Sequence, residues 1–147
     1  MTRAADTARE PERRPAPLPA ELTTSRLVLR AAAPGLAAAA ARPGAAARNR
    51  EAHAPWNPPS PSTLFDDVAQ AALLGEAASA MADGAMASWW LFERNPPGSP
   101  DAAPALGRVQ LTQIARGPFC NAMLGYSIDA AFEGRGLMRE ALQAVLS

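Results

Sequence analysis

The residues that most clearly indicate a binding site are Gly134 and Gly136, which lie between an expected strand and an expected helix. Glycine adopts backbone conformations closed to other residues and lets a ligand approach the main chain. A helix that begins at such a turn directs several backbone N–H groups toward one point in front of its N-terminus. The turn therefore suits an anion such as a phosphate group, although an ordinary glycine turn into a helix has the same pattern.

The residues around this turn exclude two common nucleotide-binding motifs. The spacing matches neither the G-x-G-x-x-G fingerprint nor the Lys-Ser/Thr ending of a P-loop. Arg135 and Arg139 add positive charge near the first turn of the helix. Apolar residues then recur with helical spacing, so one helix face is expected to pack on a sheet: Leu137, Met138, Ala141, Leu142, Val145 and Leu146.

The remaining reactive side chains limit the possible chemistry. His53 is the only histidine and Cys120 the only cysteine, so a clustered-histidine metal site, a disulfide and a Ser–His–Asp arrangement are not expected. Cys120 has no evident activating base. Glu51 and Glu93 are possible bases, but nothing in the sequence distinguishes them from solvated carboxylates. We therefore assign no catalytic residue and no metal from the sequence.

Composition limits the partners. The 14 arginines, with no lysine beside them, balance 14 acidic residues, so the zero net charge gives no attraction toward nucleic acid or an anionic membrane. No apolar run reaches the length of a membrane span, and the first residues lack the apolar segment of a signal peptide. The expectation is a cytoplasmic protein that binds neither nucleic acid nor membrane.

Hydrophobic periodicity and turn residues predict the elements that position the glycine turn. Residues 1–21 show no periodicity and are expected to be a disordered leader to one domain at 22–147. Strands are predicted at 24–30, 89–93, 106–114 and 123–129. Helices are predicted in two pieces within 34–54, split at Pro43-Gly44, then from Ser62 or Thr63 to a stop at Gly84, and again after Gly136.

These elements predict the fold class. The last three strands are joined by loops too short for crossover helices, which indicates an antiparallel arrangement. The prediction is an α+β fold with a mostly antiparallel central sheet flanked by helices. In the long helix, an apolar set recurs at helical spacing: Leu64, Val68, Ala71, Ala72 and Gly75. One of Trp89 and Trp90 is expected to face the core.

Three segments, in order along the chain, resemble the GCN5-related N-acetyltransferase (GNAT) superfamily and its ribosomal-protein N-acetyltransferase branch. Residues 24–30 (TSRLVLR) resemble the opening strand. Residues 49–59 (NREAHAPWNPP) resemble the branch's Asn-Arg-Glu-His-x-x-Pro-Trp loop, with a shifted histidine. Residues 124–142 (LGYSIDAAFEGRGLMREAL) resemble the strand and acetyl-CoA loop, and this match is the most specific.

The resemblance implies acetyl-CoA as co-substrate. Its pantetheine arm would pair with main-chain groups at a splay in the sheet, at Tyr126, Ser127, Ile128 and Asp129. The diphosphate would sit on the glycine turn and the start of the helix, at Gly134, Arg135, Gly136, Leu137 and Met138. Glu133 takes the position where the family loop has Gln or Arg, so we expect weakened cofactor affinity.

The acceptor is expected to be an amine, either a protein N-terminus or a small molecule. His53 and Trp56 are the candidates for lining its site. The alternatives are a structural hydrogen-bonding role for His53 and a core anchor for Trp56 within the loop 52–62.

The position of the glycine turn leads to two hypotheses. A complete domain of this family continues past the acetyl-CoA helix, so a chain ending at Ser147 is expected to be C-terminally truncated, with an unpaired sheet edge at 123–129. One hypothesis is an N-acetyltransferase that transfers acetyl from acetyl-CoA to a primary amine. The other is a non-catalytic remnant or partner-binding module that uses the exposed edge, where self-association is also possible.

Overall fold

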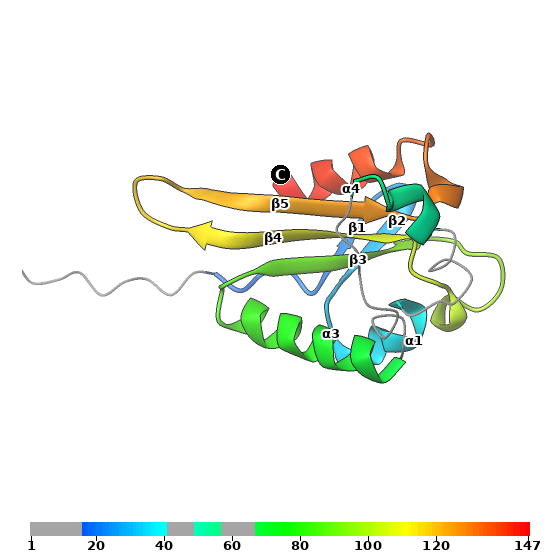
Figure 1. The fold of residues 1–147 in the computed structure, drawn as a ribbon, viewed down its shortest axis with the longest axis horizontal. Helices are drawn as coiled ribbons and strands as arrows, with labels where there is room; N and C mark the ends of the chain where they lie inside the picture. Colours follow the sequence, from blue (N-terminus) through cyan, green and yellow to red (C-terminus); the bar gives the residue numbers. More distant parts are fainter. Residues whose placement is uncertain (1–15, 41–48, 57–66) are drawn as a thin grey trace, which may run out of the picture.

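A central antiparallel sheet organises the molecule. The computed structural model describes residues 16–40, 49–56 and 67–147. Five strands pair in chain order, each antiparallel to its neighbour (Figure 1). They are β1 (Glu21–Thr23), β2 (Leu27–Ala31), β3 (Ala87–Glu93), β4 (Gly107–Ala115) and β5 (Asn121–Ile128).

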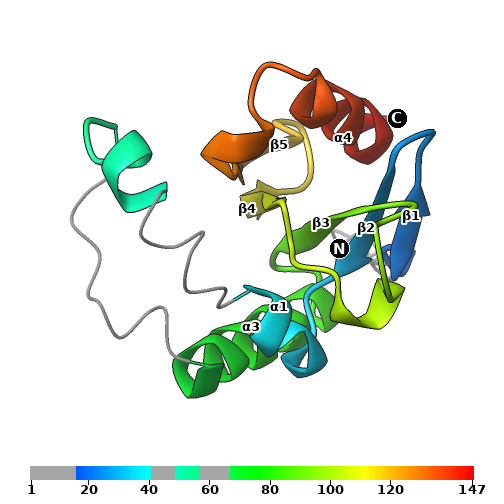
Figure 2. The same cartoon turned by 90° about the vertical axis from the view of Figure 1, so that its right-hand side faces the viewer.

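Helices cover both faces of this sheet. Helices α1 (Ala37–Ala40) and α3 (Asp67–Ala82) lie on one face, and α4 (Leu137–Leu146) lies on the other (Figure 2). Short 3-10 helices occur at η1 (Pro34–Leu36), η3 (Pro100–Ala102) and η4 (Ala130–Phe132). The arrangement confirms the predicted α+β fold with an antiparallel sheet flanked by helices.

The main core lies between the sheet and α4. Alternate residues of the strands point to this face, and side chains from β2, β3, β4 and α4 are buried together. The cluster consists of Leu27, Leu29, Ala87, Trp89, Leu91, Leu106, Val109, Leu137 and Ala141. Trp89 is 2% exposed and its indole Nε1 donates to the Pro19 carbonyl, whereas Trp90 is only half-buried. The prediction that one of these tryptophans faces inward is confirmed.

The predicted strand at 24–30 is in fact a turn at 24–26 followed by β2, because β1 already ends at Thr23. Thr24 donates its N–H to the Leu27 carbonyl at 2.9 Å, and its hydroxyl accepts the Leu27 N–H at 2.9 Å. These bonds reverse the chain between β1 and β2. Since Glu21 already lies in β1, the expected disordered leader to residue 21 is too long by at least this residue.

The long helix differs from the prediction in the face it buries. Val68 is 76% exposed, while Leu74 is 2% exposed. Alanine and glycine expose little apolar area, so their spacing does not decide which face a helix buries, and the larger Leu74 does. Gly84, at φ 70°, follows the last turn as predicted. The predictions for Pro43-Gly44, Ser62, Thr63 and Leu64 concern positions outside the described residues.

Candidate functional site

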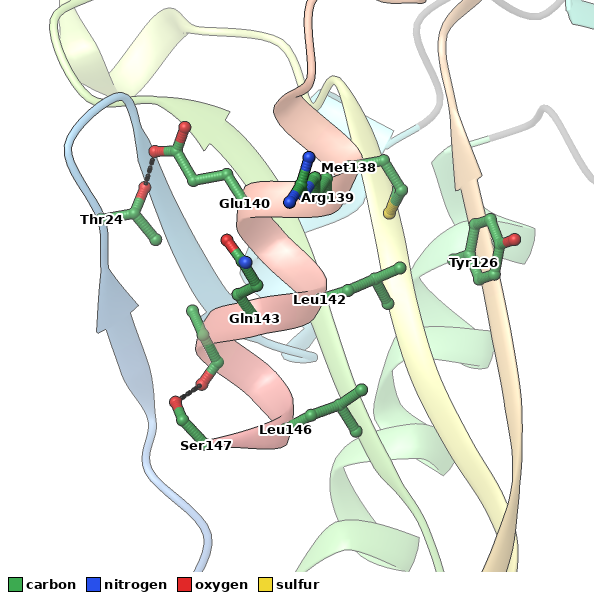
Figure 3. A pocket seen from close by; sticks show the side chains of 10 residues that line it. Thr24, Tyr126, Met138, Arg139, Glu140, Leu142, Gln143, Leu146 and Ser147 are labelled. Atoms are coloured by element: carbon green, nitrogen blue, oxygen red, sulfur yellow. Dashed lines mark hydrogen bonds between the residues drawn. The ribbon is translucent and has the colours of Figure 1, made fainter.

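The predicted ligand segment runs along an open edge of the sheet. β5 is last in the strand order, so among the described strands none pairs with its outer edge. Tyr126 on β5 is 59% exposed, and Figure 3 shows it facing Leu142 and Leu146 of α4 across an open groove. The groove is lined by Thr24, Tyr126, Met138, Arg139, Glu140, Leu142, Gln143, Ala144, Leu146 and Ser147.

The four residues predicted to bind pantetheine differ in the direction of their main-chain N–H and C=O groups, which face either β4 or the open edge. The Asp129 N–H donates to the Leu106 carbonyl at 2.6 Å, toward β4. Because main-chain groups alternate in direction along a strand, those of Ser127 also face β4. Those of Tyr126 and Ile128 face the open edge. Two of the four predicted residues therefore present free-edge N–H and C=O groups to a ligand.

Asp129 shapes the turn that follows β5. Its carboxyl group is 3% exposed and accepts the N–H of Ala131 at 3.0 Å, which caps η4. The adjacent Ala130 N–H is bound by the Asn49 side-chain oxygen at 2.9 Å. Both groups hold the chain in the bend between the open edge and the glycine turn.

The glycine turn has the backbone form that an anion cradle requires. Gly134 (φ 73°) and Gly136 (φ 74°, the N-cap of α4) are left-handed, and residues 133–136 are exposed. The amides of a first helical turn have no partner within their own helix. A Cβ on Gly134 would meet nothing within 4 Å, so the space in front of the turn is open. The predicted residues at 134–138 thus lie together beside the free edge of β5.

The helix that starts here is fixed by the core on one side. Leu137 is 7% and Ala141 0% exposed, with Met138, Leu142 and Val145 packed against the same cluster. Leu146 is 61% exposed and lines the groove, so the prediction that it packs on the buried face is wrong.

Glu140 fixes the other side of α4, a role that no local sequence pattern predicts. Its carboxylate accepts hydrogen bonds from the Thr24 hydroxyl (2.5 Å), the Ser25 hydroxyl (3.0 Å), the Arg26 N–H (2.9 Å) and Arg26 Nε (2.7 Å). The bond from Thr24 first, then those from Arg26 and Ser25, lowers the pKa of Glu140 to about 2, against the opposing effect of burial. The β1–β2 turn is thereby tied to the first turn of α4.

Replacing Glu140 with glutamine should weaken the fold in a pH-dependent way. The carboxylate of Glu140 has a folded pKa below its ordinary value of 4.5, so its stabilisation is present above pH 4.5 and is lost as the pH falls toward 2. At pH 7 we expect E140Q to lose about 1 to 2 kcal/mol, since the pair with Arg26 is partly solvated. Urea unfolding at pH 7, 4.5 and 3 should show the difference from wild type narrowing with acid. A difference that stays constant over this range would contradict the assignment.

Residues 49–56 approach the turn from the opposite side. Residues 49–53 are helical, so the predicted loop begins two residues later than expected. His53 Nε2 lies 3.6 Å from Glu133 Oε1, which brings a predicted acceptor-site residue to the start of the glycine turn. Trp56 is 85% exposed, and the alternative in which it anchors a loop in the core is wrong. Within this segment, Asn49 reaches Ala130 and His53 reaches Glu133.

Neither a metal-binding group nor a membrane-spanning helix occurs in the described ranges. No group of three His, Cys, Asp or Glu side chains there is placed to hold a metal ion. No helix within the same ranges is long and apolar enough to cross a membrane. Cys120, the single thiol, is exposed at the β4–β5 hairpin and donates to the Gly117 carbonyl.

Sequence comparison assigns most of the chain to one family. The profile of the acetyltransferase (GNAT) domain matches residues 26–147. No protein in a collection of curated sequences matches the chain.

Solved structures share the fold. Ribosomal-protein-S5-alanine acetyltransferase from Vibrio fischeri superposes with a TM-score of 0.73 at 21% identity, over 86% of this chain and 64% of that one. A RimL ribosomal L7/L12 α-N-protein acetyltransferase in complex with coenzyme A gives a TM-score of 0.66 at 20% identity, over 86% and 65%. An acetyltransferase from Salmonella typhimurium that modifies the N-terminal serine of L7/L12 gives 0.55 at 19% identity, over 83% and 62%. The chain therefore spans less than two thirds of the length of each of these structures.

Proposed function

The chain belongs to the acetyltransferase (GNAT) domain family, and from that premise we propose that it transfers an acetyl group from acetyl-CoA to a primary amine. The observation that carries the proposal is the glycine turn, with its two left-handed glycines in front of α4 and beside the open edge of β5. The similarity of the fold to a coenzyme A complex supports the same ligand.

The residues present fit the two halves of acetyl-CoA. Amide N–H groups at 134–138 suit the diphosphate, since phosphate oxygens accept hydrogen bonds from the N-terminal turn of a helix. Tyr126 and Ile128 offer main-chain groups to the amides of pantetheine, as an added strand would use them. The exposed side chains of the groove suit the apolar parts of that arm. Acetyl-CoA supplies the thioester carbonyl that the amine attacks.

An α-amine is the acceptor that asks least of the protein. Only a neutral amine attacks the carbonyl, and an α-amino group with a pKa near 8 is about 10% neutral at pH 7, while a lysine amine is below about 0.1%. An α-amine therefore needs little help from a general base. We propose a protein N-terminus as the acceptor, with His53 close to the entry of the turn.

Incubation with peptides tests this activity directly. With acetyl-CoA present, a peptide with a free N-terminus should gain one acetyl group by mass spectrometry, while the same peptide with a blocked N-terminus should not. Thiol release from coenzyme A should match the acetyl gained. Thiol release without acetylated peptide would contradict transfer to the amine.

Replacing Glu133 with glutamine should tighten acetyl-CoA binding. Its carboxylate stands at the start of the turn, 54% exposed, and repels a diphosphate. At roughly 6 Å in water one such repulsion is about 0.7 kcal/mol, so the Kd should fall about threefold. Glu51→Gln, which removes an exposed carboxylate from the neighbouring helical turn, is the matched control. Calorimetric titration that shows equal or weaker binding by E133Q would contradict this placement of the diphosphate.

The open edge also favours pairing with a second copy of the chain. β5 carries no charged residue, and Met123 (57% exposed), Leu124 (40%) and Tyr126 (59%) lie along it. Two such strands bring no like charges together, and proteins usually protect edges with charge or proline. We propose an antiparallel β5–β5 dimer that competes with acetyl-CoA for one edge.

Sedimentation at increasing protein concentration tests the dimer. Wild type should show a monomer–dimer equilibrium that acetyl-CoA shifts toward monomer, and Met123→Lys should be monomeric throughout. A dimer that acetyl-CoA leaves unchanged would place the contact elsewhere.

A further inference from the structure

The guanidinium of Arg26 binds the glycine turn from the side of the β1–β2 turn. Its Nη1 donates to the Arg135 carbonyl at 2.9 Å, and its Nε donates to Glu140 at 2.7 Å. Its Nη2 would lie 3.7 Å from a Cβ on Gly136. Arg26 lies in the β1–β2 turn. Its side chain thus binds Arg135 in the glycine turn and Glu140 in the first turn of α4, which are 109 and 114 residues away in sequence.

The bond to the Arg135 carbonyl sets the direction of the next N–H group. In a planar trans peptide, the C=O of one residue and the N–H of the following residue point in opposite directions. Because Arg26 binds the Arg135 carbonyl from behind, the Gly136 N–H points away from Arg26. Gly136 is itself exposed, so a ligand has access to this N–H group.

Arg26 is itself held in a fixed position. Glu140 accepts both the Arg26 main-chain N–H and its Nε, while Thr24 and Ser25 donate to the same carboxylate. The fork of the guanidinium is needed to reach two acceptors at once, since a lysine ammonium is a single point on a flexible stem. Half of the Arg26 side chain remains exposed, yet two of its donors are committed within the chain.

We propose that Arg26, oriented by Glu140, is a positioning residue that aims the Gly136 N–H at the diphosphate of acetyl-CoA. The inference rests on the proposed function, since it names the residue that shapes the same site. Arg26 acts through the Gly136 peptide and does not contact the ligand.

Three variants test this role. Arg26→Met removes both donors, and Arg26→Lys keeps the charge without the fork. Arg30→Met is the matched control, because Arg30 lies on the adjacent strand with its guanidinium over the Phe92 ring and 3.6 Å from Glu21. The readouts are the Kd of acetyl-CoA by calorimetry and the amide resonances of Gly134 and Gly136 by NMR, both well below the unfolding temperature.

The expected result separates position from charge. R26M and R26K should both raise the Kd about tenfold or more, the effect of misaligning one donor to a charged group. The Gly136 amide resonance should shift in both before ligand is added, while R30M matches wild type. A wild-type Kd in R26K would show that charge alone matters and would overturn the inference, as would a wild-type Kd in R26M. A wild type that binds no acetyl-CoA would instead overturn the proposed function itself.

Discussion

Gly136→Val should abolish acetyl-CoA binding while leaving the chain folded. Gly136 has φ 74°, a conformation that costs a β-branched residue about 1 to 3 kcal/mol. The chain relieves that strain by rotating the peptides on both sides, which turns the N–H groups at the start of α4 away from one point. Losing two donors to a charged phosphate should raise the Kd about a hundredfold or more. Calorimetric titration of the variant measures this loss.

Gly98→Val is the control for backbone strain alone. Gly98 has φ 95° and nothing within 4 Å of its Cβ position, and it lies in the loop after β3. A Cβ on Gly136 would meet only Arg26 Nη2 at 3.7 Å, an ordinary contact, so backbone strain is the main effect at both positions. The two variants should lose similar stability in thermal unfolding, and only G136V should lose acetyl-CoA. Equal binding by both variants would remove the diphosphate from the glycine turn.

Gly107→Ala should destabilise the whole domain. A Cβ at this position would lie 2.2 Å from the Ser127 carbonyl oxygen and 2.9 Å from the Ile128 Cα, both of them backbone atoms that cannot move independently. Gly107 pairs with Ile128, so the added Cβ forces β4 and β5 apart at the end of β5 that leads to the glycine turn. We expect a loss of about 3 kcal/mol and a Tm lower by about 10 °C.

Gly75→Ala is the opposite control for the same chemical change. Gly75 lies within α3, where an added Cβ meets only the Pro34 Cγ at 3.7 Å, an ordinary contact. Alanine in a helix interior is more stable than glycine by about 1 kcal/mol, so G75A should raise the Tm. Thermal unfolding followed by circular dichroism compares the two. A Tm of G107A equal to that of wild type would contradict the close approach of β4 and β5.

Local sequence patterns were enough to predict the sheet and the site turn. Apolar segments bounded by turn residues predict β3, β4 and β5, whose observed bounds differ from the predictions by at most two residues. Gly134 and Gly136 both have positive φ, as a glycine turn into a helix suggests.

Long-range contacts explain what the sequence could not predict. The alternation of Leu27 and Leu29 with Val28 and Arg30 predicts a strand over 24–30 and gives no sign of the turn at its start. Glu140, whose carboxylate binds this turn, is 114 residues beyond Arg26. A local signal did exist, since threonine often bonds the main chain of a turn. The core-anchor alternative for Trp56 is wrong because an aromatic residue in a loop shows no partner in the sequence, and Trp56 is 85% exposed. Its role at the acceptor site stays a prediction.

Binding of acetyl-CoA at the glycine turn and the open edge of β5 underlies every function proposed above. Titration of the folded, monodisperse wild-type chain with acetyl-CoA in a calorimeter tests it most directly. We expect one site per chain, with a lower Kd in E133Q and no measurable binding in G136V. No heat on titration of the folded wild type would contradict it.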